Sequence, residues 1–246
     1  MRYQRLLGLV FLLLIPLDLL ALDFTGYSCG SNGNYTTNSA YRANIKTTLS
    51  SLSTNIDNDG FYNASTGQGP DRVNAIAWCR GDVQLNACRQ FLQKAGADLV
   101  NSCPVQKEAF FFNDFCTLRY SNATVYGNLA LDPSQYYWNP GNSMSPKQFK
   151  EDLRALLESL RIRATGGSST RKVAAGNVTG PDFQRIFALV QCTPDLSSEK
   201  CTRCLVRVIS VIPICCSERI GGSVFAPSCS FRFETKSYQQ EAQGPM

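Results

Sequence analysis

The sequence predicts an α+β protein built from two tandem copies of one disulfide-stapled domain. Three patterns predict it: a repeated set of cysteines, an amphipathic helix at the start of each copy, and an alternating strand at its end. The cysteines of the first copy recur 113 residues later, Cys79, Cys88, Cys103 and Cys116 matching Cys192, Cys201, Cys216 and Cys229. Asp82 and Asp195 agree at the same offset, as do Arg119 and Arg232, so the chain contains a tandem duplication.

Helical spacing predicts two helices in each copy. The first helix repeats the pattern i, i+3, i+4, i+7 as Ile45, Thr48, Leu49 and Leu52, and then as Leu153, Leu156, Leu157 and Leu160. The second helix presents one face as Cys88, Phe91, Leu92, Ala95 and Leu99, and then as Cys201, Cys204, Leu205, Val208 and Ile212. The first helices are offset by only 108 residues, so we expect about five extra residues in the Gly/Ser-rich loop at 165–170.

The last segment of each copy alternates like a strand, with Cys229, Phe231 and Phe233 on one side in the second copy. Helices between strand-like segments, without regular βαβ alternation, indicate an α+β domain. We expect the first domain at 22–131 and the second at 146–235. Between them a linker at 132–145 carries breaking residues such as Pro133 and Pro140, and residues 236–246 form a polar tail.

The first residues indicate a secretory signal peptide, which we assign to 1–21. Arg2 and Arg5 form a basic start, residues 6–15 are an unbroken apolar run, and Ala21 is small enough for cleavage. The apolar run is well short of the ~20 residues that span a bilayer. The sequence therefore predicts a secreted protein without stable membrane insertion.

Eleven cysteines in an exported chain indicate a disulfide framework, because the extracellular environment is oxidising. Four N-glycosylation sequons agree with export, and we expect at least one to be glycosylated. Their asparagines are Asn34, Asn63, Asn122 and Asn177. The formal net charge of +5 is mild and no Lys/Arg run occurs, which argues against nucleic acid as a partner.

Little in the sequence indicates catalysis. The chain has no histidine, which removes Ser–His and Cys–His pairs, and it has neither a G-x-S-x-G elbow nor a phosphate-binding loop. A pair of carboxylates could hydrolyse glycosides, but no Asp/Glu cluster points to one. We therefore predict no catalytic residues, no cofactor, and a protein that is not an enzyme.

The Cys201-x2-Cys204 pair has two alternatives to a structural role. A thioredoxin-type redox motif needs a βαβ setting that the sequence lacks. A zinc site would take Cys215, Cys216 or Cys229 as further ligands. Export and the repeated gaps favour structural disulfides, so we predict no metal site.

Two aromatic runs allow either packing or binding. Residues 110–112 are three consecutive phenylalanines, and residues 136–138 read Tyr-Tyr-Trp between the copies. Either run could contact a carbohydrate or a protein partner. We favour core packing for the phenylalanines and packing of the domain junction for the second run.

The cysteine motifs resemble the plant ginkbilobin-2-homologous domain, also called domain of unknown function 26. The resemblance rests on Cys79-x8-Cys88, on Cys192-x8-Cys201-x2-Cys204 and on flanking segments such as 116–122, and it covers nearly the whole chain after the signal. Two such domains behind a signal peptide are similar to a cysteine-rich repeat secretory protein. The resemblance implies two helices packed on an antiparallel sheet in each domain. Some relatives carry the pair as an ectodomain of receptor-like kinases or of plasmodesmata-located proteins, and some single-domain relatives are mannose-binding antifungal proteins.

The resemblance also implies the disulfide pairing: Cys29 with Cys103, Cys79 with Cys88, Cys192 with Cys201, and Cys204 with Cys229. Three cysteines are then unassigned, Cys116, Cys215 and Cys216. The adjacent pair could form a vicinal bridge or leave one member to reach elsewhere. We expect Cys116 to be a buried, inert thiol and the protein to be a monomer.

The mannose site that the resemblance implies consists of an Asn after the first cysteine, an Arg seven residues after the fourth, and a Glu five residues after the last. In the first repeat these positions hold Gly30, Phe110 and Ser121. In the second repeat the first cysteine is missing, Ser223 stands at the Arg position, and Glu234 matches. Glu234 is therefore the single carbohydrate-binding candidate, and we expect no measurable mannose binding of that kind.

These features together predict a non-enzymatic binding protein of the plant apoplast. We expect it to act in stress, defence or developmental signalling. Its partner would be a cell-surface receptor ectodomain or a cell-wall carbohydrate. The alternative is a directly acting antimicrobial or antifungal lectin-like protein.

Overall fold

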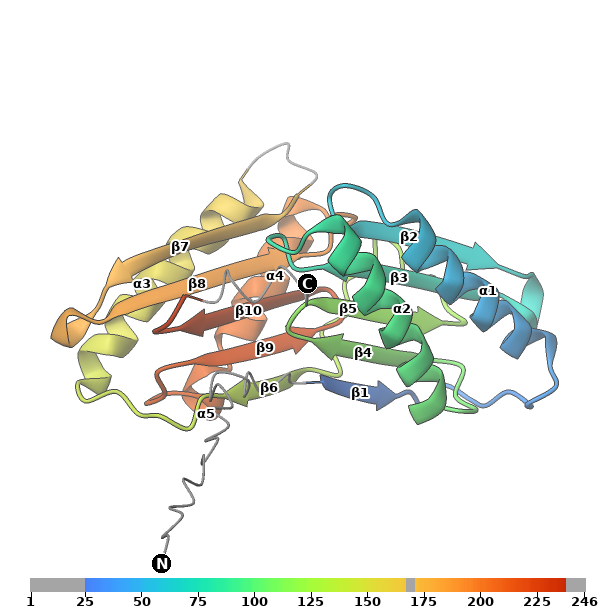
Figure 1. Ribbon diagram of the computed structural model, residues 1–246, viewed down its shortest axis with the longest axis horizontal. Coiled ribbons are helices and arrows are strands. Elements are labelled where there is room, and N and C mark those ends of the chain that lie inside the picture. Colours follow the sequence, from blue (N-terminus) through green and yellow to red (C-terminus); the bar gives the residue numbers. More distant parts are fainter. Residues whose placement is uncertain (1–24, 167–170, 238–246) are drawn as a thin grey trace, which may run out of the picture.

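The computed structural model describes residues 25–166 and 171–237, which form two five-stranded antiparallel sheets, each with helices on one face (Figure 1). This arrangement confirms the predicted α+β fold with two tandem domains. The predicted signal peptide at 1–21, part of the Gly/Ser-rich loop and the tail from residue 238 onward lie outside the described residues. Within the described ranges, no helix is long and apolar enough to cross a membrane.

The first repeat places its strands in the order β1-β4-β5-β3-β2. These strands are β1 (Thr25–Cys29), β2 (Phe61–Thr66), β3 (Val73–Cys79), β4 (Ala109–Asn113) and β5 (Cys116–Ser121). One face carries α1 (Ala40–Asn55) and α2 (Leu85–Ser102), and the short 3-10 helix η1 (Gly69–Asp71) connects β2 to β3.

The second repeat has the same topology, with the strand order β6-β9-β10-β8-β7. Its strands are β6 (Gln135–Trp138), β7 (Val173–Thr179), β8 (Arg185–Cys192), β9 (Gly222–Ala226) and β10 (Cys229–Glu234). Its helices are α3 (Pro146–Thr165), α4 (Ser198–Ile209) and the one-turn α5 (Ile212–Cys215), and η2 (Pro181–Phe183) connects β7 to β8.

The predicted apolar faces of the first helices are the faces that pack on the sheets. Helix α1 buries all four predicted residues, and α3 buries Leu153, Leu157 and Leu160 while Leu156 packs half-buried beside them. Ser39 precedes α1 and its hydroxyl accepts a hydrogen bond from a first-turn backbone N–H, which satisfies one of the donors left free at a helix start.

The structure differs from the predicted linker at 132–145. Residues 135–138 form β6, which pairs antiparallel with β9, so the second sheet begins upstream of the predicted boundary at 146. Pro133 and Pro140 flank this strand rather than interrupt it, as expected for prolines at the ends of an edge strand.

The pairing register makes β6 the counterpart of β1. Tyr27 pairs with Phe111, and Tyr136 pairs with Val224, which is the residue 113 positions after Phe111. By the same register Cys29 pairs with Ala109 and Trp138 with Gly222. Trp138 therefore occupies the position of the cysteine that the second repeat lacks.

The helix-free faces of the two sheets meet around an aromatic cluster. Phe110 and Phe112 project from β4 into this junction with Phe225, and the half-buried Tyr137 packs against them. Phe111 points the other way, into the core under α1 and α2. The ring centroids of Phe112 and Phe225 lie 5.3 Å apart, and these two residues are equivalent in the repeats. Equivalent residues in mutual contact indicate an approximate two-fold relation, with the helices of the two repeats on opposite sides (Figure 1).

The packing roles predicted for the two aromatic runs are found in part. The phenylalanine triplet divides between core and junction, and Tyr137 packs the junction. Tyr136 and Trp138 remain 40% and 43% exposed on the outer side of β6.

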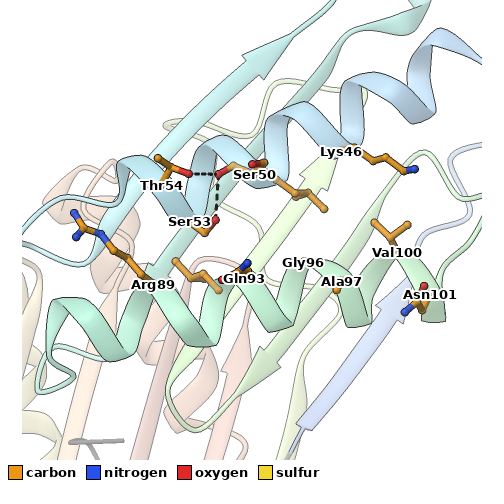
Figure 2. Close-up of a pocket in the computed structure, with 12 residues that line it drawn as sticks. Lys46, Ser50, Ser53, Thr54, Arg89, Gln93, Gly96, Ala97, Val100 and Asn101 are labelled. Carbon is orange, nitrogen blue, oxygen red and sulfur yellow. Dashed lines mark hydrogen bonds between the residues drawn. The ribbon is translucent and has the colours of Figure 1, made fainter.

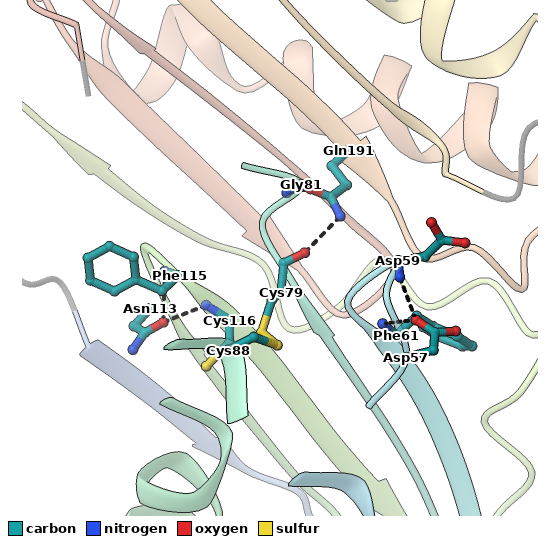
Figure 3. Close-up of a disulfide and its surroundings, with 10 residues drawn as sticks. All are labelled: Asp57, Asp59, Phe61, Cys79, Gly81, Cys88, Asn113, Phe115, Cys116 and Gln191. Carbon is teal, nitrogen blue, oxygen red and sulfur yellow. Dashed lines mark hydrogen bonds between the residues drawn. A yellow bond between two sulfur atoms is a disulfide. The ribbon is translucent and has the colours of Figure 1, made fainter. Parts of the chain in front are cut away.

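One glutamine ties the repeats together beside a disulfide (Figure 3). The Gln191 side chain donates a hydrogen bond to the Cys79 carbonyl at 3.0 Å and accepts one from the Gly81 amide at 2.9 Å. Cys79 itself is bonded to Cys88 on α2. An ion pair between Asp114 and Arg232 (3.4 Å) also crosses the junction, so the two domains contact each other through both polar and aromatic groups.

Candidate functional site: two Arg–Glu–Asn clusters

The structure contains the four disulfides that the resemblance implies, Cys29–Cys103, Cys79–Cys88, Cys192–Cys201 and Cys204–Cys229. A fifth bond joins the neighbours Cys215 and Cys216, one of the two alternatives left open by the sequence. Cys201 and Cys204 have different partners, so they do not form a dithiol pair with each other. Among the described residues no group of His, Cys, Asp or Glu could hold a metal ion.

Cys116 is a free, buried thiol. Burial in apolar surroundings raises the pKa of this thiol, which disfavours the reactive thiolate. Phe91 stands where a partner cysteine would stand by comparison with Cys204. Its ring stacks on Phe115, with centroids 4.4 Å apart.

The four sequon asparagines are all exposed. They are distributed over the loop after β1, strand β2, the segment after β5, and strand β7. The Asn177 side chain accepts a hydrogen bond from Arg185. Their glycosylation stays a prediction.

The first repeat carries a polar cluster at the end of its sheet nearest the β1 edge. Arg119 on β5 is paired with Glu108, just before β4, and its Nε lies 3.2 Å from a carboxylate oxygen. Asn32 donates a hydrogen bond to the other oxygen of Glu108. The side chains of Arg119 and Glu108 are only 18% and 17% exposed. They border a cavity of about 260 Å³ that Gly30 and Asp132 also line.

The second repeat builds the same three groups at the equivalent place. Arg232, the counterpart of Arg119, lies 3.8 Å from a carboxylate oxygen of Glu234, and Asn139 donates a hydrogen bond of 3.4 Å to the other oxygen. This cluster is looser than the first one. Arg232 is also shared with Asp114 across the domain junction.

The two carboxylates come from opposite strands of one cross-strand pair. Ala109 pairs with Tyr120 and Gly222 with Phe233, so Glu108 faces Ser121 in the first repeat and Gly221 faces Glu234 in the second. Glu108 and Gly221 are equivalent positions. A side chain at residue 221 would collide with the Glu234 carboxylate, which fills that space. The carboxylate has therefore moved from one strand to the other while keeping its arginine partner.

The structure adds one residue to the candidate site of the second repeat. Trp138 takes the place of the missing first cysteine, so Asn139 stands at the position of the Asn that the family's mannose site requires. The sequence pattern does not reveal Asn139, because tryptophan replaces the cysteine that would mark its position. Glu234 and Asn139 lie together, whereas Ser223 does not supply the guanidinium. In the first repeat the corresponding positions cannot contact a ligand in this way, since Phe110 and Ser121 are buried.

These clusters can recognise hydroxyl groups but show no catalytic arrangement. Each one combines a guanidinium, which only donates hydrogen bonds, a carboxylate, which only accepts them, and an amide, which does both. The groups hold each other in place, which reduces the entropy lost when a ligand binds.

The fold and the disulfides define a class of extracellular proteins with tandem cysteine-rich domains. The sequence profile of the salt stress response/antifungal family matches residues 28–123 and 138–236, and the chain belongs to this family. The second matched segment begins at the last residue of β6.

Proteins similar to the chain include both secreted proteins and receptors. It is 36% identical over 228 residues to an antimicrobial ginkbilobin-2-like protein of Castanea crenata, covering 92% of this chain and 94% of that protein. It is 33% identical over 220 residues to cysteine-rich repeat secretory protein 38 of Arabidopsis thaliana, covering 89% and 87%. It is 40% identical over 222 residues to cysteine-rich receptor-like protein kinase 26 of Arabidopsis thaliana, covering 89% of this chain but 32% of the kinase. The chain thus spans about a third of the length of that receptor.

Two solved structures share the fold. Both are tandem DUF26 ectodomains of Arabidopsis thaliana cysteine-rich receptor-like proteins. That of PDLP8 has a TM-score of 0.71 and 20% identity, covering 85% of this chain and 95% of that one. That of PDLP5 has a TM-score of 0.70 and 24% identity, covering 86% and 98%. The comparisons confirm the resemblance and the extracellular, secreted type of the protein.

Proposed function

We propose that this protein is a non-enzymatic recognition protein of the plant apoplast that engages a cell-wall glycan, in stress, defence or developmental signalling. The cluster of Asn32, Glu108 and Arg119 beside its cavity carries this proposal. A sugar presents neighbouring hydroxyl groups that both donate and accept hydrogen bonds, and this cluster offers both kinds of partner in fixed positions.

The first repeat supports the proposal better than the second. Its three groups contact each other closely and border a cavity. In the second repeat Arg232 is divided between Glu234 and Asp114, so its guanidinium has less freedom to meet a ligand. Glu234, the candidate from the sequence, is thus proposed as part of a weaker site.

A glycan array with the glycosylated, fully oxidised protein tests the proposal. We expect saturable binding to a plant wall glycan that falls at least tenfold in Glu108→Gln and in Arg119→Lys. The control is Glu158→Gln, which breaks an exposed ion pair on α3 far from the cavity. Binding that survives both first-repeat substitutions and vanishes in Glu234→Gln would move the site to the second repeat. Binding that survives all three would reject the clusters as the glycan site.

A protein partner is the second candidate, and exposed aromatic residues favour it. Tyr27 and Tyr136 are equivalent residues on the outer edge strands of the two sheets, with Trp138 beside Tyr136 at 6.1 Å between ring centroids. Exposed tyrosine and tryptophan are common at protein interfaces. Capture of a receptor ectodomain that is lost in Tyr136→Ala and Trp138→Ala, but kept in Glu108→Gln, would favour this candidate.

The antimicrobial alternative is supported by the similarity to the Castanea crenata protein. In this alternative the Arg–Glu–Asn cluster would bind a glycan of a microbe instead of a glycan of the plant cell wall. Inhibition of fungal growth that is abolished by Glu108→Gln would favour it over signalling in the plant.

A further inference from the structure

A groove runs between α1 and α2 on the outer side of the first repeat (Figure 2). It encloses about 500 Å³. The side chains that matter for its chemistry are Lys46, Ser50, Ser53, Arg89, Gln93 and Asn101. This groove is separate from the Arg–Glu–Asn cluster, because the helices lie on the opposite face of the sheet from the domain junction.

The groove exists because the helices approach each other over a glycine. Gly96 on α2 has no side chain, and a Cβ built there would lie 3.6 Å from the Cβ of Leu49 on α1. Leu49 and Leu92 close the bottom, so the floor is apolar and shallow. The polar residues stand on the rims above it.

The lining of the groove carries positive charge and no negative charge. Lys46 lies at one end and Arg89 at the other (Figure 2), and none of the lining residues is acidic. Within the described part of the chain, the side chains of Lys46, Arg89, Gln93 and Asn101 make no hydrogen bond, and the two cations make no ion pair. Anionic ligands are therefore favoured, and the polar groups that would meet them are not already engaged.

Hydroxyl groups lie between the two cations on the α1 rim. Ser53 and Thr54 donate hydrogen bonds to the Ser50 carbonyl, at 3.1 and 2.9 Å, which leaves their oxygen atoms able to accept hydrogen bonds. The stretch from Lys46 to Thr54 covers roughly 12 Å along the helix, at 1.5 Å per residue. An elongated ligand fits a rim of this length, with the two cations at opposite ends of the groove.

We propose that the α1–α2 groove binds a linear anionic oligosaccharide. Its carboxylates would pair with Lys46 and Arg89, and its hydroxyls would bind to Gln93, Asn101 and the serine oxygens. An acidic peptide fits less well, because the groove lining has no aromatic residue and no deep apolar pocket to anchor a peptide side chain. This second site is independent of the proposed function at the Arg–Glu–Asn cluster.

The second repeat shows what closes such a groove. By alignment of the repeats, Ile209 stands at the position of Gly96, and Val206 at that of Gln93. Glu158 and Arg161 stand at the positions of Ser50 and Ser53, and they form an ion pair across one turn of α3. Helix α4 also ends at Ile209, before reaching the equivalent of Asn101. The residues of the second repeat therefore indicate which substitutions should block the groove of the first.

Calorimetry with tri-galacturonic acid tests the proposal, and its fully methyl-esterified form is the uncharged probe. We expect the acid to bind the full chain, with affinity falling as salt rises, and the ester not to bind. Arg89→Gln and Lys46→Gln should each weaken binding at least tenfold. Lys94→Gln removes an equal charge from an exposed position of α2 outside the groove, and it should change the affinity less than twofold.

Substitutions taken from the second repeat sharpen the test. Ser50→Glu places a carboxylate between the cations and should abolish binding, whereas Thr47→Glu adds the same charge to an exposed position of α1 outside the groove and should leave most of it. Gly96→Ala narrows the floor at a contact distance that the helices tolerate, so it should weaken binding while thermal stability is kept or increased.

Three outcomes would overturn the proposal. One is equal binding of the methyl ester, which would show that the ligand's charge is not the basis of recognition. Another is equal binding of a hexamer of glutamate, which would remove the saccharide class. The third is loss of acid binding in Glu108→Gln but not in Ser50→Glu, which would place the ligand at the Arg–Glu–Asn cluster and leave the groove empty.

Discussion

The two repeats have the same strand order and register, yet they place equivalent chemistry on different residues. Glu108 and Glu234 bring a carboxylate to the same arginine position from opposite strands. The first repeat ties β1 to the end of α2 with Cys29–Cys103, while the second has Trp138 in place of Cys29 and joins Cys216 to its neighbour. The sheet framework therefore determines where the carboxylate lies relative to the arginine, and either of two neighbouring strands can carry it.

The repeats also differ in their response to ionisation. In the first repeat burial raises the pKa values of Cys116, Tyr35, Tyr41 and Tyr120, whereas in the second repeat it raises that of Tyr137, at the domain junction. The corresponding core of the second repeat is built around disulfide-bonded Cys229 and the rings of Phe231 and Phe233, which do not ionise.

The largest expected difference concerns Cys29–Cys103 and Cys215–Cys216, two of the three disulfides that the repeats do not share. Cys29→Ala with Cys103→Ala opens a bond across 74 residues, and it should lower the free energy of unfolding by about 4 kcal/mol in the chain-entropy model. Cys215→Ala with Cys216→Ala opens a bond between neighbours, which restricts almost no loop, and should cost much less. Urea unfolding of both double variants is the measurement. Equal losses of unfolding free energy in the two double variants would show that loop length does not determine how much each disulfide stabilises the protein.

The aromatic junction should respond alike from both sides. Phe112→Ala and Phe225→Ala each remove a ring from one stacked pair, and each should cost about 3 kcal/mol of unfolding free energy. The double variant should cost clearly less than the sum, because the first substitution already removes the shared contact. Phe183→Ala, at a side chain that is 96% exposed, is the control and should have little effect. Additive losses would contradict direct coupling across the junction.

Alkaline pH should destabilise the first repeat more than the second. The folded state keeps Cys116 protonated while the unfolded chain ionises it, so its contribution is fully present below the ordinary thiol pKa of 9.0 and is lost as pH rises above it. The loss should be about 1.4 kcal/mol for each pH unit above 9, and Tyr41 and Tyr120 should add to it above pH 10.

Urea midpoints at pH 7.5 and 10 measure this effect, with Cys116→Ala as the matched variant. Cys116→Ala should lose less stability than the unchanged protein between these two pH values. An identical pH dependence would mean that the thiol ionises while still folded.

The smallest expected change comes from giving the first repeat the bridge that it lacks. Phe91→Cys should bond to Cys116, because the equivalent residues Cys204 and Cys229 are bridged with their Cα atoms 6.0 Å apart. Loop closure and the loss of the ring contact with Phe115 oppose each other, so the stability should change by no more than about 1 kcal/mol. Thiol titration after denaturation should fall from one group to none. Two titrating thiols would show that the first repeat cannot adopt this geometry.

The sequence was sufficient for features that depend on local periodicity or on repeated spacing. The buried faces of α1 and α3 follow from apolar residues at helical intervals, and the duplication follows from four equal cysteine offsets. The fold class and the family resemblance depended on the same signals, and both are confirmed.

Features that depend on long-range pairing could not be predicted. Strand β6 has only four residues between prolines, so it lacks a recognisable pattern until β9 pairs with it. Asn139 can be recognised as a candidate site residue only after the strand register aligns Trp138 with Cys29. The α1–α2 groove depends on two helices meeting at Gly96, and a single glycine inside a helical pattern does not show which helix will face it.

The contact between Phe112 and Phe225 also bears on how strong the junction has to be. Equivalent rings in mutual contact are typical of the interface between two identical subunits, but here one polypeptide carries both partners. Tethering makes the association intramolecular, at an effective concentration that is of millimolar order for short flexible connections. A junction of modest intrinsic affinity is then closed nearly all the time, at any dilution of the protein. Polar groups such as Gln191 and Arg232 can therefore occupy it, where two free subunits of this size would need a larger apolar surface to remain associated.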